Sequence, residues 1–114
     1  DPQLTANGIS GIIEIDDPNF GNSWTNIPLQ MMLDNGFRYG EKVHIQLRHK
    51  DEVLFDRNVM FDKTFGMVKK GDPILYNNEL MNCALAVCQG SFAERYGVGF
   101  GPEFRILIGK AENE

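Results

Sequence analysis

The 114-residue sequence predicts an all-β domain, an antiparallel β-barrel or sandwich, and two observations support this class. First, apolar Val43, Ile45 and Leu47 alternate with polar residues, as on a strand with one buried and one solvent-exposed face. Second, turn-forming residues recur between short apolar runs, as at residues 34–36 and 70–73. Short strands separated by frequent glycine turns are typical of a sandwich or a barrel.

The elements follow one another without an internal repeat or a low-complexity linker. An apolar run at residues 9–15 precedes a polar loop at 16–28, and a second apolar run overlaps the end of that loop at 27–32. The further strands expected in the sequence are 43–47, 53–59, 74–76, 83–89 and 104–108, with a turn at 50–51 between the first two. Antiparallel pairing is the expected arrangement.

One short helix is predicted near Ser91 to Tyr96. Ser91 and Glu94 have the spacing of a capping box, and Gly97 is expected to end the helix after one or two turns. The glycines from Gly97 to Gly101 resemble a phosphate loop only superficially. They follow a helix and precede a strand, whereas a phosphate loop needs the opposite order. We therefore interpret them as a flexible turn.

Composition excludes several classes of partner. The net charge is −5, and the longest Lys/Arg run is Lys69-Lys70, which argues against nucleic acid or an anionic membrane surface. The longest apolar stretch falls short of the ~18 residues of a membrane span.

The chain starts at Asp1 without a methionine and is short for a two-domain enzyme, so we expect a processed or excised part of a soluble, cytoplasmic protein.

Cysteines and histidines do not predict a disulfide or a metal site. Cys83 and Cys88 are five residues apart, and an odd spacing on a strand directs side chains to opposite faces. His44 and His49 are also five apart, without a second Cys/His pair at ligand spacing. Buried or edge thiols and solvated imidazoles are the expected states, and no Ser/His/Asp order is recognisable.

The loop at residues 16–28 concentrates recognition chemistry. Phe20 and Trp24 bracket Gly21 and Asn22, which places flat apolar faces beside an amide with one acceptor and two donors. That combination suits a purine. Composition alone also fits an ordinary surface loop with Trp24 folded back into the core, and the acidic pair before the loop fits either acid–base work or solvated turn formers.

Two blocks of sequence resemble one known family. The first is Asp-x-Pro-x-Phe-Gly-Asn-x-Trp-Thr-Asn-Ile at residues 16–27. The second combines Lys-Thr-Phe-Gly at 63–66, Gly-x-Pro-x-Leu-Tyr at 71–76, Ala-Leu-Ala at 84–86, Gln-Gly at 89–90 and Glu94. Together they resemble, from about residue 12 to 108, the C-terminal domain of the S-adenosylmethionine hydroxide adenosyltransferases and their fluorinase and chlorinase relatives.

The resemblance implies that residues 1–114 form the single, substrate-binding β domain of a larger enzyme, whose N-terminal α/β domain is absent from this chain. It implies a homotrimer in which S-adenosylmethionine lies between this domain and the N-terminal domain of a neighbouring subunit. The implied reaction gives adenosine and methionine by attack of water or hydroxide, without a cofactor or metal. A halide-using enzyme, a non-catalytic nucleoside-binding module and a structural barrel used for assembly remain alternatives.

For the adenine, the resemblance implies four contacts on this chain. Phe20 and Phe65 would form apolar walls, and the Asn22 amide would hydrogen-bond the edge of the base. Ala84 would contact the exocyclic amine through its backbone. No catalytic residue is expected on this chain.

For the methionine end, the resemblance implies that Trp24 lies near the sulfonium, which a π face tolerates. Asp16 would bind the ammonium group, and Asp17 is an alternative because Asn19 is one extra residue before Phe20.

The sequence departs from the family pattern at three places, and the first of these concerns the methionine end of the ligand. Asn-Glu-Leu-Met stands at residues 78–81 where relatives carry Asn-Ser-x-Gly, so Glu79 replaces a small hydroxyl residue with a carboxylate. Asn82 replaces an Arg or similar residue, and Cys88 replaces an Asn. We keep Glu79 and Asn82 as candidate substrate contacts, and we expect these departures to change affinity or ligand preference.

Overall fold

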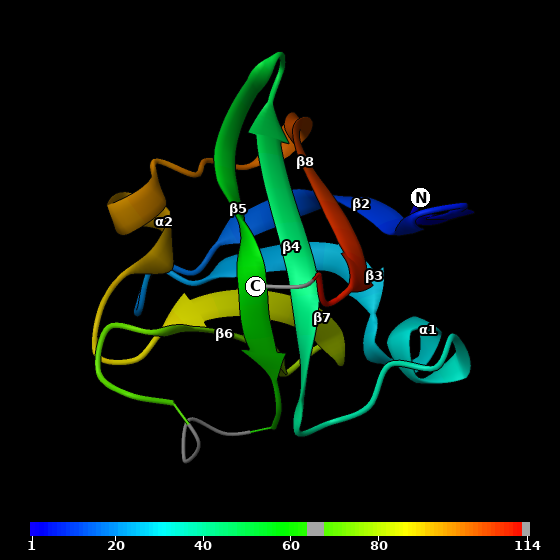
Figure 1. Ribbon diagram of the computed structural model, residues 1–114. Helices are drawn as coiled ribbons and strands as arrows, with labels where there is room; N and C mark the ends of the chain where they lie inside the picture. The colour runs from blue at the N-terminus through cyan, green and yellow to red at the C-terminus, as the bar shows by residue number, and fades with distance from the viewer. Residues whose placement is uncertain (64–67, 113–114) are drawn as a thin grey trace.

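A computed structural model describes residues 1–63 and 68–112 of the chain, and it confirms the all-β class (Figure 1). The strands are β1 (Gln3–Thr5), β2 (Gly8–Asp16), β3 (Ser23–Pro28), β4 (Glu41–His49), β5 (Glu52–Phe61), β6 (Pro73–Asn77), β7 (Asn82–Val87) and β8 (Gly101–Lys110). They pair in the order β1-β2-β3-β7-β6-β5-β4-β8, and β8 also pairs with β2. The sheet therefore closes into a barrel, which β1 extends at one edge.

Strand direction differs from the prediction at one place. The other pairings are antiparallel, including the closing pair, in which Ile9 lies opposite Ile108. β5 and β6 pair in parallel, through Met60 opposite Ile74 and Phe61 opposite Leu75. Because only the end of β5 overlaps the start of β6, β6 runs on past β5 instead of folding back along it. Alternation indicates which face a residue occupies but not strand direction, so the sequence pattern did not reveal this pair.

The barrel interior is packed with apolar side chains. Ile13, Ile45, Phe61, Leu85 and Ile108 are among the residues that are fully buried in one continuous core. Burying each such side chain contributes about 1.5–3 kcal/mol relative to leaving it exposed. A filled interior leaves the outer face and the rims as places for a ligand.

The predicted C-terminal helix is confirmed as α2 (Phe92–Tyr96). The Ser91 Oγ accepts a hydrogen bond from the Glu94 backbone N–H at 3.2 Å, and Gly97 ends the helix with a φ of 68°. Phe92 is fully buried, with its ring centroid 5.2 Å from that of Phe55, so the helix is anchored on the barrel. Gly97 and Gly99 lie in the connection to β8, and Gly101 begins that strand.

A second helix, α1 (Leu29–Asp34), was not predicted and lies on the opposite side of the barrel from α2 (Figure 1). It follows Pro28, whose φ of −64° suits a helix start although no side chain caps it. Leu29 and Met32 are buried three residues apart, which is helical spacing. The second apolar run of the sequence is therefore the end of β3 followed by a helical turn.

Candidate functional site

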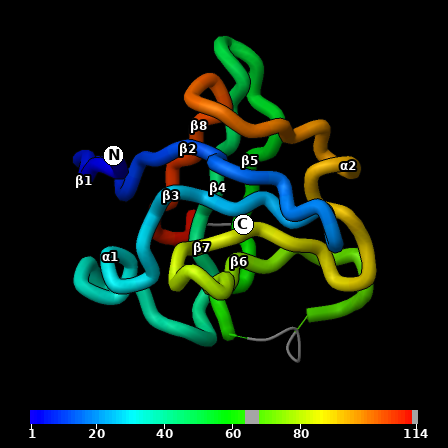
Figure 2. Tube along the Cα trace, turned by 180° about the vertical axis from the view of Figure 1, so that it is seen from behind, coloured from blue at the N-terminus to red at the C-terminus, as the bar shows by residue number. Residues whose placement is uncertain are grey.

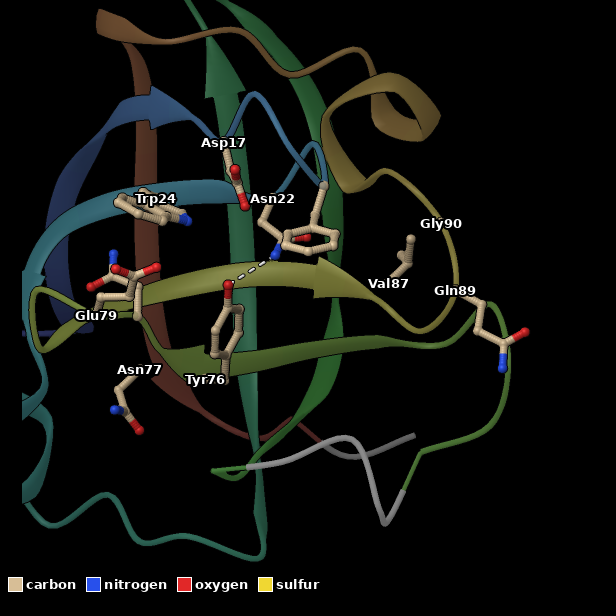
Figure 3. Close-up of a pocket in the computed structure, with 11 residues that line it drawn as sticks. Asp17, Asn22, Trp24, Tyr76, Asn77, Glu79, Val87, Gln89 and Gly90 are labelled. Carbon is tan, nitrogen blue, oxygen red and sulfur yellow. Dashed lines mark hydrogen bonds between the residues drawn. The ribbon is translucent and has the colours of Figure 1, made fainter.

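The pocket that contains most of the predicted site residues, called the main pocket below, lies on the outer face of the barrel beside β3 and β6. This face is turned toward the viewer in Figure 2. It has a volume of about 430 Å³. Its walls combine aromatic rings, amides and two carboxylates (Figure 3), from the residues Asp17, Phe20, Asn22, Trp24, Tyr76, Asn77, Asn78, Glu79, Val87, Gln89 and Gly90. A cleft of this size and mixed polarity fits a small organic ligand.

The loop between β2 and β3 forms one wall and is held in a tight turn. The Asp17 N–H donates to the Asn22 carbonyl, and the Gly21 N–H donates to the Asp17 carbonyl, both at 2.8 Å. Gly21 has a φ of 71°, and a Cβ on it would lie 2.0 Å from the Ser91 Oγ. The Ala93 N–H also donates to the Gly21 carbonyl at 2.9 Å, so α2 supports this loop. Glycine is required here both by conformation and by space.

Asn22 is positioned by a residue of β6. Its Nδ2 donates to the Tyr76 hydroxyl at 2.9 Å, and its side chain is almost completely buried (Figure 3). This bond fixes the orientation of the amide, and the Oδ1 keeps its capacity to accept a hydrogen bond. Burial raises the pKa of Tyr76 above its usual 10.0, so the phenol is neutral at pH 7 and can accept this hydrogen bond.

The two aromatic side chains on neighbouring positions of the sheet are separated by a small residue. Ala84 in the middle of β7 lies opposite Trp24 on β3 and opposite Tyr76 on β6. Directly opposed residues project from the same face of a sheet, so these three side chains share the outer face. Ala84 is fully buried and adds little height between the rings. The Trp24 indole and the Tyr76 phenol therefore both line the pocket from the outer face of the sheet.

The turn between β6 and β7 brings Glu79 to the pocket. The Asn78 Oδ1 accepts hydrogen bonds from the backbone N–H groups of Leu80 at 2.8 Å and Asn82 at 3.1 Å, and Met81 adopts a φ of 62°. Asn78 is buried, and its Nδ2 has no hydrogen-bond partner in the protein. This donor is therefore a buried polar group without a partner among the described residues.

The structure brings four of the predicted site residues together at this pocket, namely Phe20, Asn22, Trp24 and Glu79. Phe20 is 70% exposed, so its ring is accessible at the wall of the pocket. Predicted Phe65 lies outside the described residues. The remaining predicted residues, Asp16, Asn82 and Ala84, are not among the residues that line the pocket.

The acidic pair before the loop divides into two environments. Asp17 lines the pocket, is 8% exposed, and accepts a hydrogen bond from the Asn19 N–H at 2.9 Å. Asp16 lies at the end of β2, where burial raises the pKa of its carboxyl group. The position of Asp17 makes it the better placed of the two for a contact with a pocket ligand.

Sequence reasoning had not assigned Tyr76, Asn77, Asn78, Val87, Gln89 or Gly90 to the site. Two of these had a usable signal. Tyr76 and Gln89-Gly90 belong to the second family-like block, and alternation along β6 puts Tyr76 on the face opposite that of buried Leu75. The role of Asn78 depends on turn geometry that the sequence does not display.

The histidines contact neighbouring side chains, and the cysteines are not bonded to each other. The His44 Nε2 is 2.6 Å from the Asp56 Oδ1, and the His49 ring stacks on Phe104 with centroids 4.2 Å apart. Cys83 and Cys88 are both free thiols. Within residues 1–63 and 68–112, His, Cys, Asp and Glu form no group of three or more that could hold a metal ion. The helices described there are not long and apolar enough to cross a membrane.

Fold and site together define a β-barrel domain with a pocket on its outer face that is lined by aromatic rings, amides and carboxylates. Residues 10–105 match the family described as the SAM hydroxide adenosyltransferase C-terminal domain, and this chain belongs to that family. It is also 31% identical, over 109 residues, to a fluorinase from Actinopolyspora mzabensis. That match covers 92% of this chain but 35% of the fluorinase, so the chain spans about a third of its curated relative.

Two solved structures share the fold. One is an uncharacterised conserved protein from Thermotoga maritima, with a TM-score of 0.83 and 24% identity, covering 96% of this chain and 39% of that protein. The other is a conserved hypothetical protein from Thermus thermophilus, with a TM-score of 0.60 and 24% identity, covering 92% of this chain and 36% of that protein. At this identity the likeness concerns the fold alone.

Proposed function

We propose that this chain is the C-terminal, substrate-binding domain of a larger enzyme that cleaves S-adenosylmethionine at the ribose 5′ carbon. Hydroxide, or water that then loses a proton, forms the new C–O bond while the C–S bond breaks. Methionine leaves as a neutral thioether and adenosine is the second product. A neutral leaving group needs no metal or redox cofactor to stabilise it, so we expect none. The observation that supports this function best is the aromatic, amide-lined pocket in a chain of this family.

The adenine would lie against the aromatic side chains of the pocket. Phe20 and Tyr76 offer π faces, and the Asn22 Oδ1 would accept a hydrogen bond from the exocyclic amine. These groups are uncharged at neutral pH, so they recognise the neutral base without binding phosphate or carboxylate compounds.

The sulfonium end would lie toward the Trp24 indole and the Asp17 carboxylate. A π face and a carboxylate each stabilise a positive charge, and Asp17 is positioned by the backbone of its own loop. Both groups would stabilise the bound sulfonium by electrostatic attraction in a partly desolvated pocket. The domain thus contributes binding and orientation, which is the main requirement of an in-line displacement.

We expect the remaining wall of the site from the N-terminal α/β domain of a neighbouring subunit in a homotrimer. The pocket has a highly exposed aromatic residue, Phe20, at its wall. Such exposure suits a surface that a second domain covers. The residues that handle the nucleophile would belong to that second domain, because the pocket described here offers no assembled acid–base pair.

A halide-using reaction is the second candidate, and the 31% identity to a fluorinase is the observation that favours it. In that reaction a halide ion would replace hydroxide as the nucleophile, and methionine would leave in the same way. The product would be a 5′-halogenated deoxyadenosine in place of adenosine.

The test is chromatography of products after full-length protein is incubated with S-adenosylmethionine in halide-free buffer and in buffer with fluoride, chloride or bromide. Adenosine at equal rates in every buffer supports the hydroxide reaction. A halogenated nucleoside that forms only with halide supports the second candidate. Adenosine binding without any turnover would instead identify a non-catalytic nucleoside-binding module.

A further inference from the structure

The lining of the main pocket has a one-sided charge. Asp17 and Glu79 contribute carboxylates, and no Lys, Arg or His is among the described residues that form its walls. The other polar groups are amides and the Tyr76 phenol. Asp17 and Glu79 would therefore repel a carboxylate on a ligand, and these lining residues include no cation that would compensate for the repulsion.

Both carboxylates interact electrostatically with the Tyr76 hydroxyl. The negative charges of Asp17 and Glu79 each contribute to raising the pKa of the Tyr76 hydroxyl, although burial of the phenol is the larger cause. The Asn19 N–H donates a hydrogen bond to the Asp17 carboxylate. Glu79 lies in the β6–β7 turn, which the Asn78 side chain stabilises by accepting a hydrogen bond from the Leu80 N–H. Figure 3 shows Glu79 on the Trp24 side of Tyr76, in the region assigned above to the sulfonium end of the ligand.

We propose that Glu79 makes this pocket select adenine nucleosides whose cationic tail ends in an amine and carries no carboxylate. This inference rests on the proposed function. A tail with only an amine gains attraction from both acidic residues, whereas an amino-acid tail brings a carboxylate near Glu79. The displacement is unchanged, since the C–S bond at the 5′ carbon still breaks, its electron pair stays on the sulfur, and the tail leaves as a thioether that keeps its ammonium charge.

The experiment is calorimetry on full-length protein with three probes: adenosine, S-adenosylmethionine and decarboxylated S-adenosylmethionine. The wild type is expected to bind the decarboxylated compound about fivefold more tightly than S-adenosylmethionine, the size of one charge interaction at a partly exposed position. In Glu79→Gln this preference should fall to less than about twofold. Adenosine affinity should stay the same because adenosine has no tail.

Glu52→Gln is the matched control, because Glu52 begins β5 beside the β4–β5 turn and is not among the pocket residues. It removes the same charge and should leave the wild-type preference intact. Equal or tighter binding of S-adenosylmethionine by the wild type, or a preference that survives in Glu79→Gln, would overturn the inference while adenosine binding upholds the nucleoside site. Absence of binding by all three probes would overturn the proposed function as well.

Discussion

Replacing Asn22 tests the assignment of the adenine edge most directly. Asn22→Ala removes the acceptor proposed for the exocyclic amine and also removes the donor to the Tyr76 hydroxyl at 2.9 Å. Asn22 is 8% exposed, so solvent cannot easily replace the lost group. A buried polar group that loses its partner costs about 1–3 kcal/mol, which corresponds to a loss of roughly 5- to 150-fold in adenosine affinity.

Calorimetry with adenosine on full-length protein is the assay, and Tyr76→Phe separates the two losses. That variant keeps the ring and removes only the hydroxyl, so it should weaken adenosine by about 0.5–1.5 kcal/mol. The double variant should lose less than the sum of the single losses, because the two side chains share one hydrogen bond. Asn35→Ala, near the end of α1 and not among the pocket residues, is the surface control. Unchanged adenosine affinity in Asn22→Ala, with an unchanged melting temperature, would refute the adenine assignment.

The same structure supports three further predictions. Gly21→Ala should destabilise the domain by about 1–3 kcal/mol in urea unfolding, and by more than Gly40→Ala. Gly40 has a similar φ of 87°, but no atom lies within 4 Å of the place where its Cβ would be. Equal losses would contradict the expected clash with Ser91. Burial raises the pKa of Cys83 to about 12. Native protein at about pH 8 should therefore react with iodoacetamide at Cys88 only, as measured by peptide mass spectrometry. Labelling of Cys83 before unfolding would contradict this prediction. The 114-residue chain alone should release no adenosine from S-adenosylmethionine, and turnover equal to that of the full-length protein would refute the shared-site proposal.

Alternation predicted the strands well because most of them have one face in the barrel core. On β4, Val43, Ile45 and Leu47 are all buried in the interior, as their spacing indicated. The capping box at Ser91 also has a strictly local cause, and the predicted Ser91 cap was confirmed. α1 was missed because Leu29 and Met32 provide only a single helical interval, too short to differ from an apolar strand end.

The site was predictable to the extent that it lies within one contiguous segment. Phe20, Asn22 and Trp24 come from a single loop and were identified together. Tyr76 and Asn78 join them only because β7 places β6 two strands away from β3. Strand order is a property of the closed barrel, and local sequence does not specify it.

The position of the pocket explains why a single barrel of this kind would depend on a partner for chemistry. The interior is filled by core residues such as Phe61 and Ile108, and the pocket that holds the predicted site residues lies on the outer face, beside β3 and β6. A nucleoside bound there would contact the protein on one side, with Phe20 still 70% exposed before binding. Nucleophilic attack on the 5′ carbon must come from the side opposite the departing sulfur and requires exclusion of bulk water. One outer wall can orient the base and the sulfonium, but only a second surface facing it can hold the nucleophile in line, and we propose that this surface is the neighbouring subunit's N-terminal domain.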